Sequence, residues 1–336
     1  LWFGIRFRNS DLLHYRRNLI LLLQENSIFR GGYSMSASSI NSDRELTVKT
    51  NKKSFGLWFK EVGWKHIITW ALLIYALFPI LYIISTSLTD FGGIENAALF
   101  QQFHWQNYRD LFNDPSYPFP KWMLNTIIIA GTTAVLSVFI SACAAYAFSR
   151  LRFRGRRPGL LALILIQMFP AISGLVAIFG ILSWLTDNVP AIGLGTKAGL
   201  ILVYLGGSLG AGTYLMYGFF NTVPTEIDEA AKIDGATHTQ IYFQIILRLV
   251  APVLAVMALL SFIGTFSDYI LASIVFSKTD QQTVAVGLGT LLSDPYSKNW
   301  AMFCAGAFIA ATPIVALFLG LQRYIVSGLT GGAVKG

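Results

Sequence analysis

One short segment holds the residues best suited to chemistry with a partner. Glu229-Ala230-Ala231-Lys232-Ile233-Asp234-Gly235 is followed by nine residues and then by Ile245-Ile246-Leu247. Acidic residues favour the start of a helix, alanine favours its middle, and glycine favours the left-handed turn that ends it. The segment is too short to cross a bilayer, so we expect a rigid turn around Gly235 that projects towards a partner. The plainer alternative is an ordinary re-entry helix.

The rest of the sequence contains no pattern of a catalytic, nucleotide or metal site. No G-x-x-x-x-G-K-[ST] phosphate loop occurs, and the glycines of 193–195 and 287–289 lack the strand and the lysine that such a loop needs. The four histidines are scattered, and Cys143 and Cys304 fall inside apolar stretches without a metal-ligand spacing. We therefore expect no enzyme activity, no metal and no nucleotide on this chain.

Local signals divide the segment into two short helices. Thr225 and Asp228 have the spacing of a capping box, and so do Thr237 and Gln240. The second helix carries an apolar stripe at i, i+3, i+4 and i+7 that must be buried. That stripe consists of Tyr242, Ile245, Ile246 and Leu249. We expect it to pack on the membrane-embedded part of the same chain.

The spacing of this segment resembles the EAA loop of ABC import permeases, whose pattern is E-A-A-x3-G-x9-I-x-L-P. Only the last position departs, because Arg248 replaces the proline, and Pro252 offers a break four residues later. The resemblance implies that the loop couples to separate ATPase subunits, which bind the ATP and Mg. The implied coupling residues are Glu229, Ala230, Ala231, Asp234, Gly235, Ile245 and Leu247.

The composition is that of a membrane protein, with 54% hydrophobic and only 12% charged residues, against roughly 25% charged in soluble domains. A spanning helix needs about 20 apolar residues. Six stretches meet this need: 67–88, 122–148, 159–185, 198–220, 250–276 and 301–322. Pro170, Gly174 and Gly180 interrupt the third stretch, which requires neighbouring helices around it. The expected fold is an all-α bundle of six transmembrane helices, and the resemblance implies the type I ABC importer permease fold.

Lysine and arginine indicate the orientation, because they favour the cytoplasmic side of a membrane. Residues 1–66, 149–158, 221–249 and 323–336 hold 20 of them, and the opposite side holds 5. We therefore expect a multi-pass protein of the bacterial inner membrane with both termini and the 221–249 loop in the cytoplasm. The net charge of +8 follows from this asymmetry, and the basic 150–157 run is expected to contact lipid headgroups rather than nucleic acid.

Residues 1–34 lack the apolar core and the cleavage site of a signal peptide. The 30–35 stretch can be encoded by a purine run that looks like a ribosome-binding site before ATG, so we expect translation to start at Met35. Residues 35–66 are expected to form a polar tail and then either an interfacial helix from Phe55 to His66 or the ragged start of the first span. The permease domain is expected over 67–322, with a cytoplasmic tail at 323–336.

A second resemblance narrows the family. Residues 322–336, the Gln167-Met168-Phe169-Pro170 run and Tyr204-Leu205-Gly206-Gly207 are similar to the smaller membrane subunit of maltose and maltodextrin importers. The resemblance runs from about Lys65 to the end. It implies a homologous permease subunit, two ATPase subunits and an extracytoplasmic sugar-binding protein as partners. It also implies that the ATPase subunits contact the tail, at Gly328, Leu329, Thr330 and Lys335.

Two polar residues inside the expected spans are candidates for a sugar path. A carboxylate at mid-bilayer costs about 2.5–3.5 kcal/mol, so Asp268 should either face the bundle interior or lie near the outer end of its span. Gln167 either lines the path or bridges two helices.

The outer loops at 89–121 and 277–300 are too small to capture a ligand by themselves, and the second is either a docking element for the binding protein or a passive linker. The favoured function is ATP-driven import of a malto-oligosaccharide. One alternative is the same architecture with another sugar or a glycerol phosphate. The other is a secondary transporter or channel, which would usually place several ionisable residues inside its spans, whereas Asp268 is the main one here.

Overall fold

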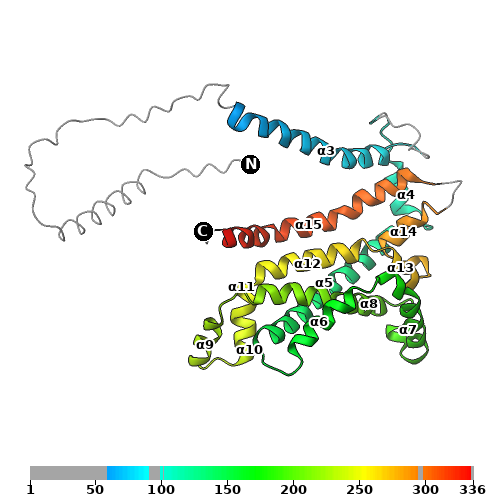
Figure 1. The fold of residues 1–336 in the computed structure, drawn as a ribbon. Coiled ribbons are helices and arrows are strands. Elements are labelled where there is room, and N and C mark those ends of the chain that lie inside the picture. Colours follow the sequence, from blue (N-terminus) through cyan, green and yellow to red (C-terminus); the bar gives the residue numbers. More distant parts are fainter. Residues whose placement is uncertain (1–58, 91–98, 101, 294–297, 334–336) are drawn as a thin grey trace, which may run out of the picture. The chain divides into compact units, whose positions relative to one another are not determined.

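The computed structural model describes residues 59–90, 99–100, 102–293 and 298–333. All regular elements in these ranges are helices (Figure 1), as the composition predicted. The chain divides into two units, Leu1–His66 and Ile67–Gly336. The expected start at Met35 and the polar tail after it lie outside the described residues, which begin with η1 (Phe59–Gly63). The second unit is the one that carries the loop singled out above.

Three helices are long and apolar enough to cross a membrane singly. They are α3 (Trp64–Ser87), α5 (Phe119–Arg150) and the Trp300–Tyr324 part of α15 (Trp300–Ala333). Of these, α5 has 32 residues and no proline beyond its first turn, where a proline costs no hydrogen bond. At 1.5 Å per residue it is about 48 Å long, which exceeds the thickness of the hydrocarbon core of a bilayer.

Three further pairs of helices meet the same test only when each pair is taken together across a bend. Arg156–Gln167 meets Ile172–Asn188 at 87°, Lys197–Gly207 meets Leu209–Phe220 at 49°, and His238–Leu249 meets Ala251–Phe266 at 76°. By length and composition, the described residues therefore contain three single spans, or six if each bent pair forms one span. The first bend follows from Pro170, which lacks an N–H and disfavours helical geometry in the residue before it.

The stretch expected as a fifth span, 250–276, is broken. Helix α12 (Ala251–Phe266) ends before Ser267, and a short helix α13 (Ile270–Val275) resumes after Tyr269. Besides α5, the elements from Gln106 to Phe220 are α4 (Gln106–Asn113), α6 (Arg156–Gln167), η2 (Ala171–Gly174), α7 (Leu175–Asn188), η3 (Pro190–Ile192) and α8 (Lys197–Phe220).

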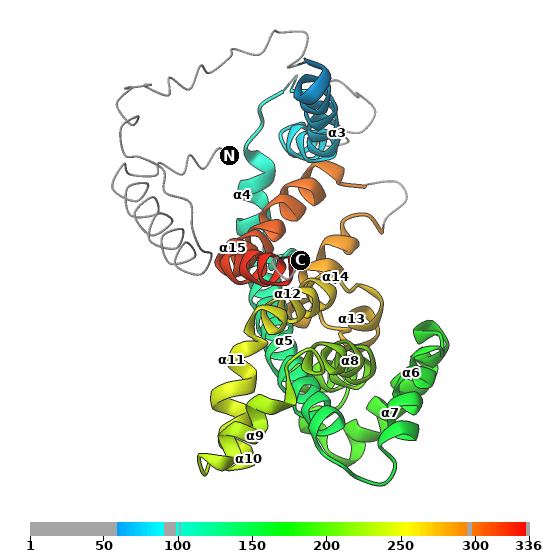
Figure 2. The ribbon, with the colours of Figure 1, turned by 60° about the vertical axis from the view of Figure 1, so that its left-hand side comes forward.

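Helix α5 packs against α8 and α12, and the three lie side by side in both ribbon views (Figures 1 and 2). Three apolar clusters form the core, and each contains residues of α5. The contact face of α5 is built from small side chains, which let helices approach closely. Its buried alanines and serines are Ala130, Ala134, Ser137, Ser141, Ala142, Ala145 and Ser149.

The two ends of α5 contact different loops. Its first turns hold η5 (Thr279–Gln281) and α14 (Val284–Thr290) through Trp122 and Asn125. Its last residue, Arg150, contacts the segment that follows α8. That segment contains α9 (Thr225–Ile233), α10 (His238–Gln240), η4 (Ile241–Ile246) and α11 (Leu247–Leu249). The excess of basic residues in the sequence predicts that this second end faces the cytoplasm.

The packing of α14 on α5 can be tested at Gly287. A Cβ at Gly287 would overlap the ring of Trp122, which is fully buried and cannot move aside. We expect Gly287→Ala to destabilise the protein by about 1–3 kcal/mol, as overpacked sites do. The matched control is Gly131→Ala on α5, where a Cβ meets no atom within 4 Å and alanine favours the helix. Thermal unfolding in detergent measures both, and equal midpoints would contradict this contact.

Candidate functional site

The loop between α8 and α12 forms two helical segments with a tight turn between them, as predicted. Gly235 has φ of +83°, in the left-handed region. The N–H of Gly235 donates to the Lys232 carbonyl at 3.0 Å, and the N–H of Ala236 donates to the Ala231 carbonyl at 2.9 Å. This pair of bonds is the Schellman motif that ends a helix. The predicted left-handed stop at Gly235 is confirmed.

One of the two predicted capping boxes is present. The Thr237 N–H donates to Gln240 Oε1 at 2.8 Å, and the Gln240 N–H donates to Thr237 Oγ1 at 3.3 Å. The prediction for Thr225 and Asp228 was wrong, because Pro224 is the N-cap and Thr225 is already the first helical residue. Asp228 makes a different contact, which its capping-box spacing did not predict.

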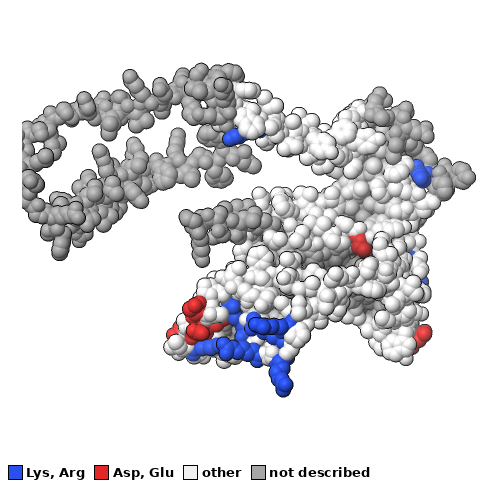
Figure 3. Space-filling model, in the orientation of Figure 1, with Lys and Arg blue, Asp and Glu red and all other residues white. Residues whose placement is uncertain are grey.

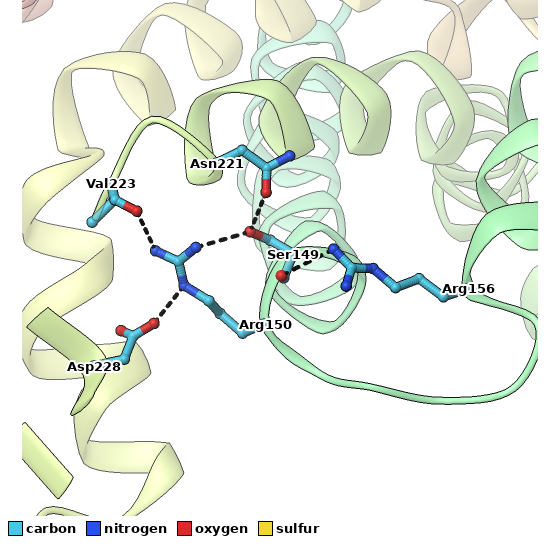
Figure 4. A network of polar contacts seen from close by, with 6 residues as sticks. All are labelled: Ser149, Arg150, Arg156, Asn221, Val223 and Asp228. Atoms are coloured by element: carbon cyan, nitrogen blue, oxygen red, sulfur yellow. Dashed lines mark hydrogen bonds and ion pairs between the residues drawn. The ribbon is translucent and has the colours of Figure 1, made fainter. Parts of the chain in front are cut away.

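Asp228 points inward and forms an ion pair with Arg150 (Figure 4). Arg150 Nε lies 2.5 Å from Asp228 Oδ2, and the two side chains are only 8% and 9% exposed. Arg150 also donates to the Val223 carbonyl at 2.7 Å and to Ser149 Oγ at 3.2 Å. The Ser149 hydroxyl in turn donates to Asn221 Oδ1 at 2.8 Å. One guanidinium group therefore ties the end of α5 to the end of α8 and to α9.

Both charges of the ion pair lie at helix ends where the helix dipole stabilises them. Arg150 lies in the last turn of α5 and Asp228 in the first turn of α9, where each charge is favoured by the helix dipole. Removing one partner of such a buried pair costs about 3–5 kcal/mol, because the other charge stays buried without compensation. The missed signal was the register of Asp228, which lies three residues before the buried Ala231 on the same helix face.

The predicted coupling residues divide between two faces of the loop. One group is exposed, together with Ile233, whose side chain is 87% exposed at the end of α9. That group consists of Glu229, Ala230, Asp234 and Gly235. The other group packs into the apolar cluster formed with α5 and α8, and it consists of Ala231, Ile245 and Leu247. The loop thus presents one polar face with a single apolar tip, and rests on the bundle with the other face.

The apolar stripe of the second helix differs from the prediction in one respect. Tyr242 and Ile246 are buried and Ile245 is partly buried, as expected, but Leu249 is 51% exposed and Ile241 is fully buried instead. The reason is that η4 is a π-helix with i to i+5 hydrogen bonds. Ile241 and Ile246, five residues apart, therefore face the same way, and the later residues turn outward.

A cavity of about 470 Å³ lies beside the ion pair. Basic side chains line it around Asp228 and Glu229, and they belong to Arg150, Arg152, Arg156 and Lys232. Figure 3 shows this basic patch next to the acidic residues at the end of the molecule where α9 lies. Four basic side chains and two carboxylates therefore line the same cavity beside α9.

Residues 137–331 match the family described as the binding-protein-dependent transport system inner membrane component. The chain belongs to this family of permeases.

Three relatives of the permease are maltose or maltodextrin transport proteins by name. The maltose/maltodextrin transport system permease protein MalG of Vibrio vulnificus is 38% identical over 282 residues, which cover 81% of this chain and 95% of that protein. The maltodextrin transport system permease protein MdxG of Bacillus subtilis is 39% identical over 270 residues, which cover 79% of this chain and 93% of that protein. MalG of Escherichia coli is 33% identical over 282 residues, covering 81% and 95%.

Two solved structures share the fold of the permease. A bacterial ABC transporter involved in the import of the acidic polysaccharide alginate gives a TM-score of 0.62 at 23% identity, covering 77% of this chain and 94% of that one. The bacterial alginate ABC transporter in complex with a periplasmic protein bound to an alginate pentasaccharide gives a TM-score of 0.58 at 15% identity. The match covers 80% of this chain and 96% of that one. The predicted ABC importer permease fold and the location in the inner membrane are confirmed.

The two candidate path residues of the permease both contact α8. Asp268 follows α12, and its Oδ1 accepts a hydrogen bond from the Tyr204 hydroxyl at 2.9 Å and from the N–H groups of Leu271 and Ala272 at 3.0 and 3.2 Å. It therefore caps α13 and joins it to α8. Gln167 ends α6 and lies over Gly210 of α8, where a Cβ would overlap its amide.

The predicted tail of the permease begins inside a helix. Helix α15 continues beyond residue 322 to Ala333, so Gly328, Leu329 and Thr330 lie in its last turns. Lys335 lies outside the described residues.

The contacts of Asp268 lead to a prediction for the stability of the permease. Asp268→Asn keeps an acceptor oxygen for Tyr204 and for the first turn of α13, so we expect a nearly unchanged thermal midpoint. Asp268→Leu leaves these donors without a partner, which costs about 1–3 kcal/mol for a buried group. Thermal unfolding in detergent compares the two variants with Tyr204→Phe, which removes one of the three bonds. A Leu variant as stable as the wild type would show that the cap contributes nothing.

Proposed function

We propose that this chain is one permease subunit of an ATP-driven importer for malto-oligosaccharides. The observation that carries the proposal is the similarity to maltose/maltodextrin permeases at 33–39% identity, over nearly their whole length. The transport family is established, and the proposal adds the substrate and the partners. The partners are a homologous permease, two ATPase subunits and an extracytoplasmic sugar-binding protein.

The exposed face of α9 is the proposed contact with the ATPase subunits. Glu229, Ala230, Asp234 and Gly235 lie on this face, and Ile233 gives it an apolar tip. Such a tip in a polar surround suits a pocket on a rigid partner, because interfaces bury apolar anchors within a polar rim. ATP and Mg are bound by the partner subunits in this proposal, and the last turns of α15 and Lys335 add a second contact.

The proposed contact with the binding protein is the outer segment between α13 and α15. Trp122 and Asn125 of α5 hold the backbone of its described part at three carbonyl groups, which supports this proposal. A segment held in this way can dock to a partner with little loss of conformational entropy. The sugar path is proposed along α8, next to Asp268 and Gln167.

A second candidate substrate is another saccharide. The solved importers of similar fold carry alginate, so this fold accommodates different sugars. Competition by a neutral malto-oligosaccharide and by a charged saccharide separates the two candidates.

Transport should require ATP hydrolysed by another chain. The importer complex, isolated through a tag on this chain and reconstituted in liposomes with its binding protein, is expected to accumulate labelled maltotriose only when ATP is present. Omitting the ATPase subunits, or supplying a non-hydrolysable ATP analogue, should abolish uptake. Unlabelled maltodextrin should compete, whereas glycerol phosphate and alginate oligosaccharides should not. Uptake by this chain alone, or uptake driven by a proton gradient, would rule out the proposal.

Gly235 provides a test of the coupling loop. No atom lies within 4 Å of a Cβ at this position, so only the left-handed backbone limits substitution. Gly235→Val should strain the turn by about 1 kcal/mol or more, whereas Gly235→Asn, which tolerates this conformation, should not. We expect the Val variant to insert in the membrane normally but to lose ATPase subunits or to hydrolyse ATP without moving sugar. If Gly235→Val transports sugar at the wild-type rate with coupled ATP hydrolysis, the turn at Gly235 is not needed for coupling.

A further inference from the structure

The outer end of α5 is clamped to a segment far away in sequence. The Trp122 indole N–H donates to the Thr279 carbonyl at 2.6 Å, and the Asn125 amide donates to the carbonyls of Asp280 and Gln282 at 3.1 Å each. Thr126 Oγ1 accepts the N–H of Val284 at 2.8 Å, which fixes the start of α14. Trp122 is fully buried and Asn125 is 6% exposed, so water does not compete for these bonds.

The inner end of the same helix is clamped as well. Arg150, its last residue, holds Asp228 of α9 and the carbonyl of Val223 just before α9. Neither clamped segment is next to α5 in sequence: Asn125 and Asp280 are 155 positions apart, and Arg150 and Val223 are 73 apart. The links therefore depend on a few side chains.

The covalent route between the two clamped segments is weaker than α5. From α9 it runs through the His238–Leu249 segment, which meets α12 at an angle of 76°, and then through the break between α12 and α13 from Phe266 to Ile270. By contrast, α5 is one unbroken helix of 32 residues that packs along its length on α8 and α12. A displacement at either end is transmitted more directly by the rigid element than by the broken one.

We propose that α5 is a rod that couples the outer segment 279–284 to α9, and that Trp122, Asn125 and Arg150 are positioning residues that clamp its ends. The inference rests on the proposed function, since the outer segment is the proposed contact for the binding protein and α9 is the proposed contact for the ATPase subunits. It adds the physical connection by which sugar-loaded binding protein outside would stimulate ATP hydrolysis inside. Both clamps must hold for the signal to pass.

A double-mutant cycle across the helix tests the rod. Trp122→Phe removes the outer N–H donor and keeps an aromatic ring, and Asp228→Asn removes the inner charge but keeps an acceptor oxygen for Arg150. In the reconstituted complex we expect each variant to keep basal ATP hydrolysis and to lose stimulation by sugar-loaded binding protein about tenfold, within the usual range of coupling between sites. Because either broken clamp interrupts the same rod, the double variant should lose no more stimulation than the more strongly impaired single variant.

Matched controls come from the exposed helix α7. Trp184→Phe and Asp187→Asn make the same chemical changes on side chains that face away from the core, and should leave the stimulation unchanged. If the fold-losses of stimulation in the two single variants multiply in the double variant, the clamps act independently and the rod proposal is wrong. If Asp228→Asn prevents assembly, Asn125→Leu paired with Arg150→Lys repeats the cycle with both inner charges kept.

The same experiment separates the inference from the function on which it rests. If the binding protein stimulates the wild-type complex and the variants equally well, the proposal that α5 acts as a rod is wrong, and the importer assignment stays in place. A wild-type complex without any sugar-dependent ATP hydrolysis would overturn both.

Discussion

The ion pair between Arg150 and Asp228 fixes the position of the whole loop between α8 and α12. Removing two charges from water is costly, and the attraction between them offsets that cost only when further hydrogen bonds complete the site. Here the Val223 carbonyl and Ser149 take two of the remaining donors of Arg150. The pair is therefore best understood as a determinant of geometry, because a well-packed apolar pair could give equal stability but would not select one orientation of α9.

The rest of the loop is arranged around this fixed point. With Asp228 turned inward, the neighbouring Glu229 and Ala230 must face outward, since successive helical residues differ by about 100°. Ala231 then returns to the interior and packs in the apolar cluster. The Schellman turn at Gly235 and the capping box of Thr237 and Gln240 set the direction of the chain after α9. The local motifs shape the loop, and the ion pair attaches it to the bundle.

Local features were predictable from the sequence because they depend on neighbouring residues. The helical class follows from composition, the stop at Gly235 from its tolerance of positive φ, and the bend near residue 170 from proline. What pattern reasoning missed depends on contacts between distant residues or on an unusual helix. Nothing near Arg150 in sequence indicates Asp228 as its partner, and nothing local marks η4 as a π-helix. Of the proposed coupling residues, the pattern located the segment but not which of them face outward.

The π-helix has a consequence for the length of the chain at this point. Residues 241–246 wind with one residue more per hydrogen-bonded ring than an α-helix does. Deleting a single residue here would return the segment to ordinary α-helical winding, because the wider turn accommodates one extra residue. The helices on either side would keep nearly their present rotation, so α11 and α12 would still present the same faces to α5. A deletion within the regular helix α12 would instead rotate everything after it by about 100°. The wide turn is therefore a place where the chain can shorten by one residue and keep its packing faces.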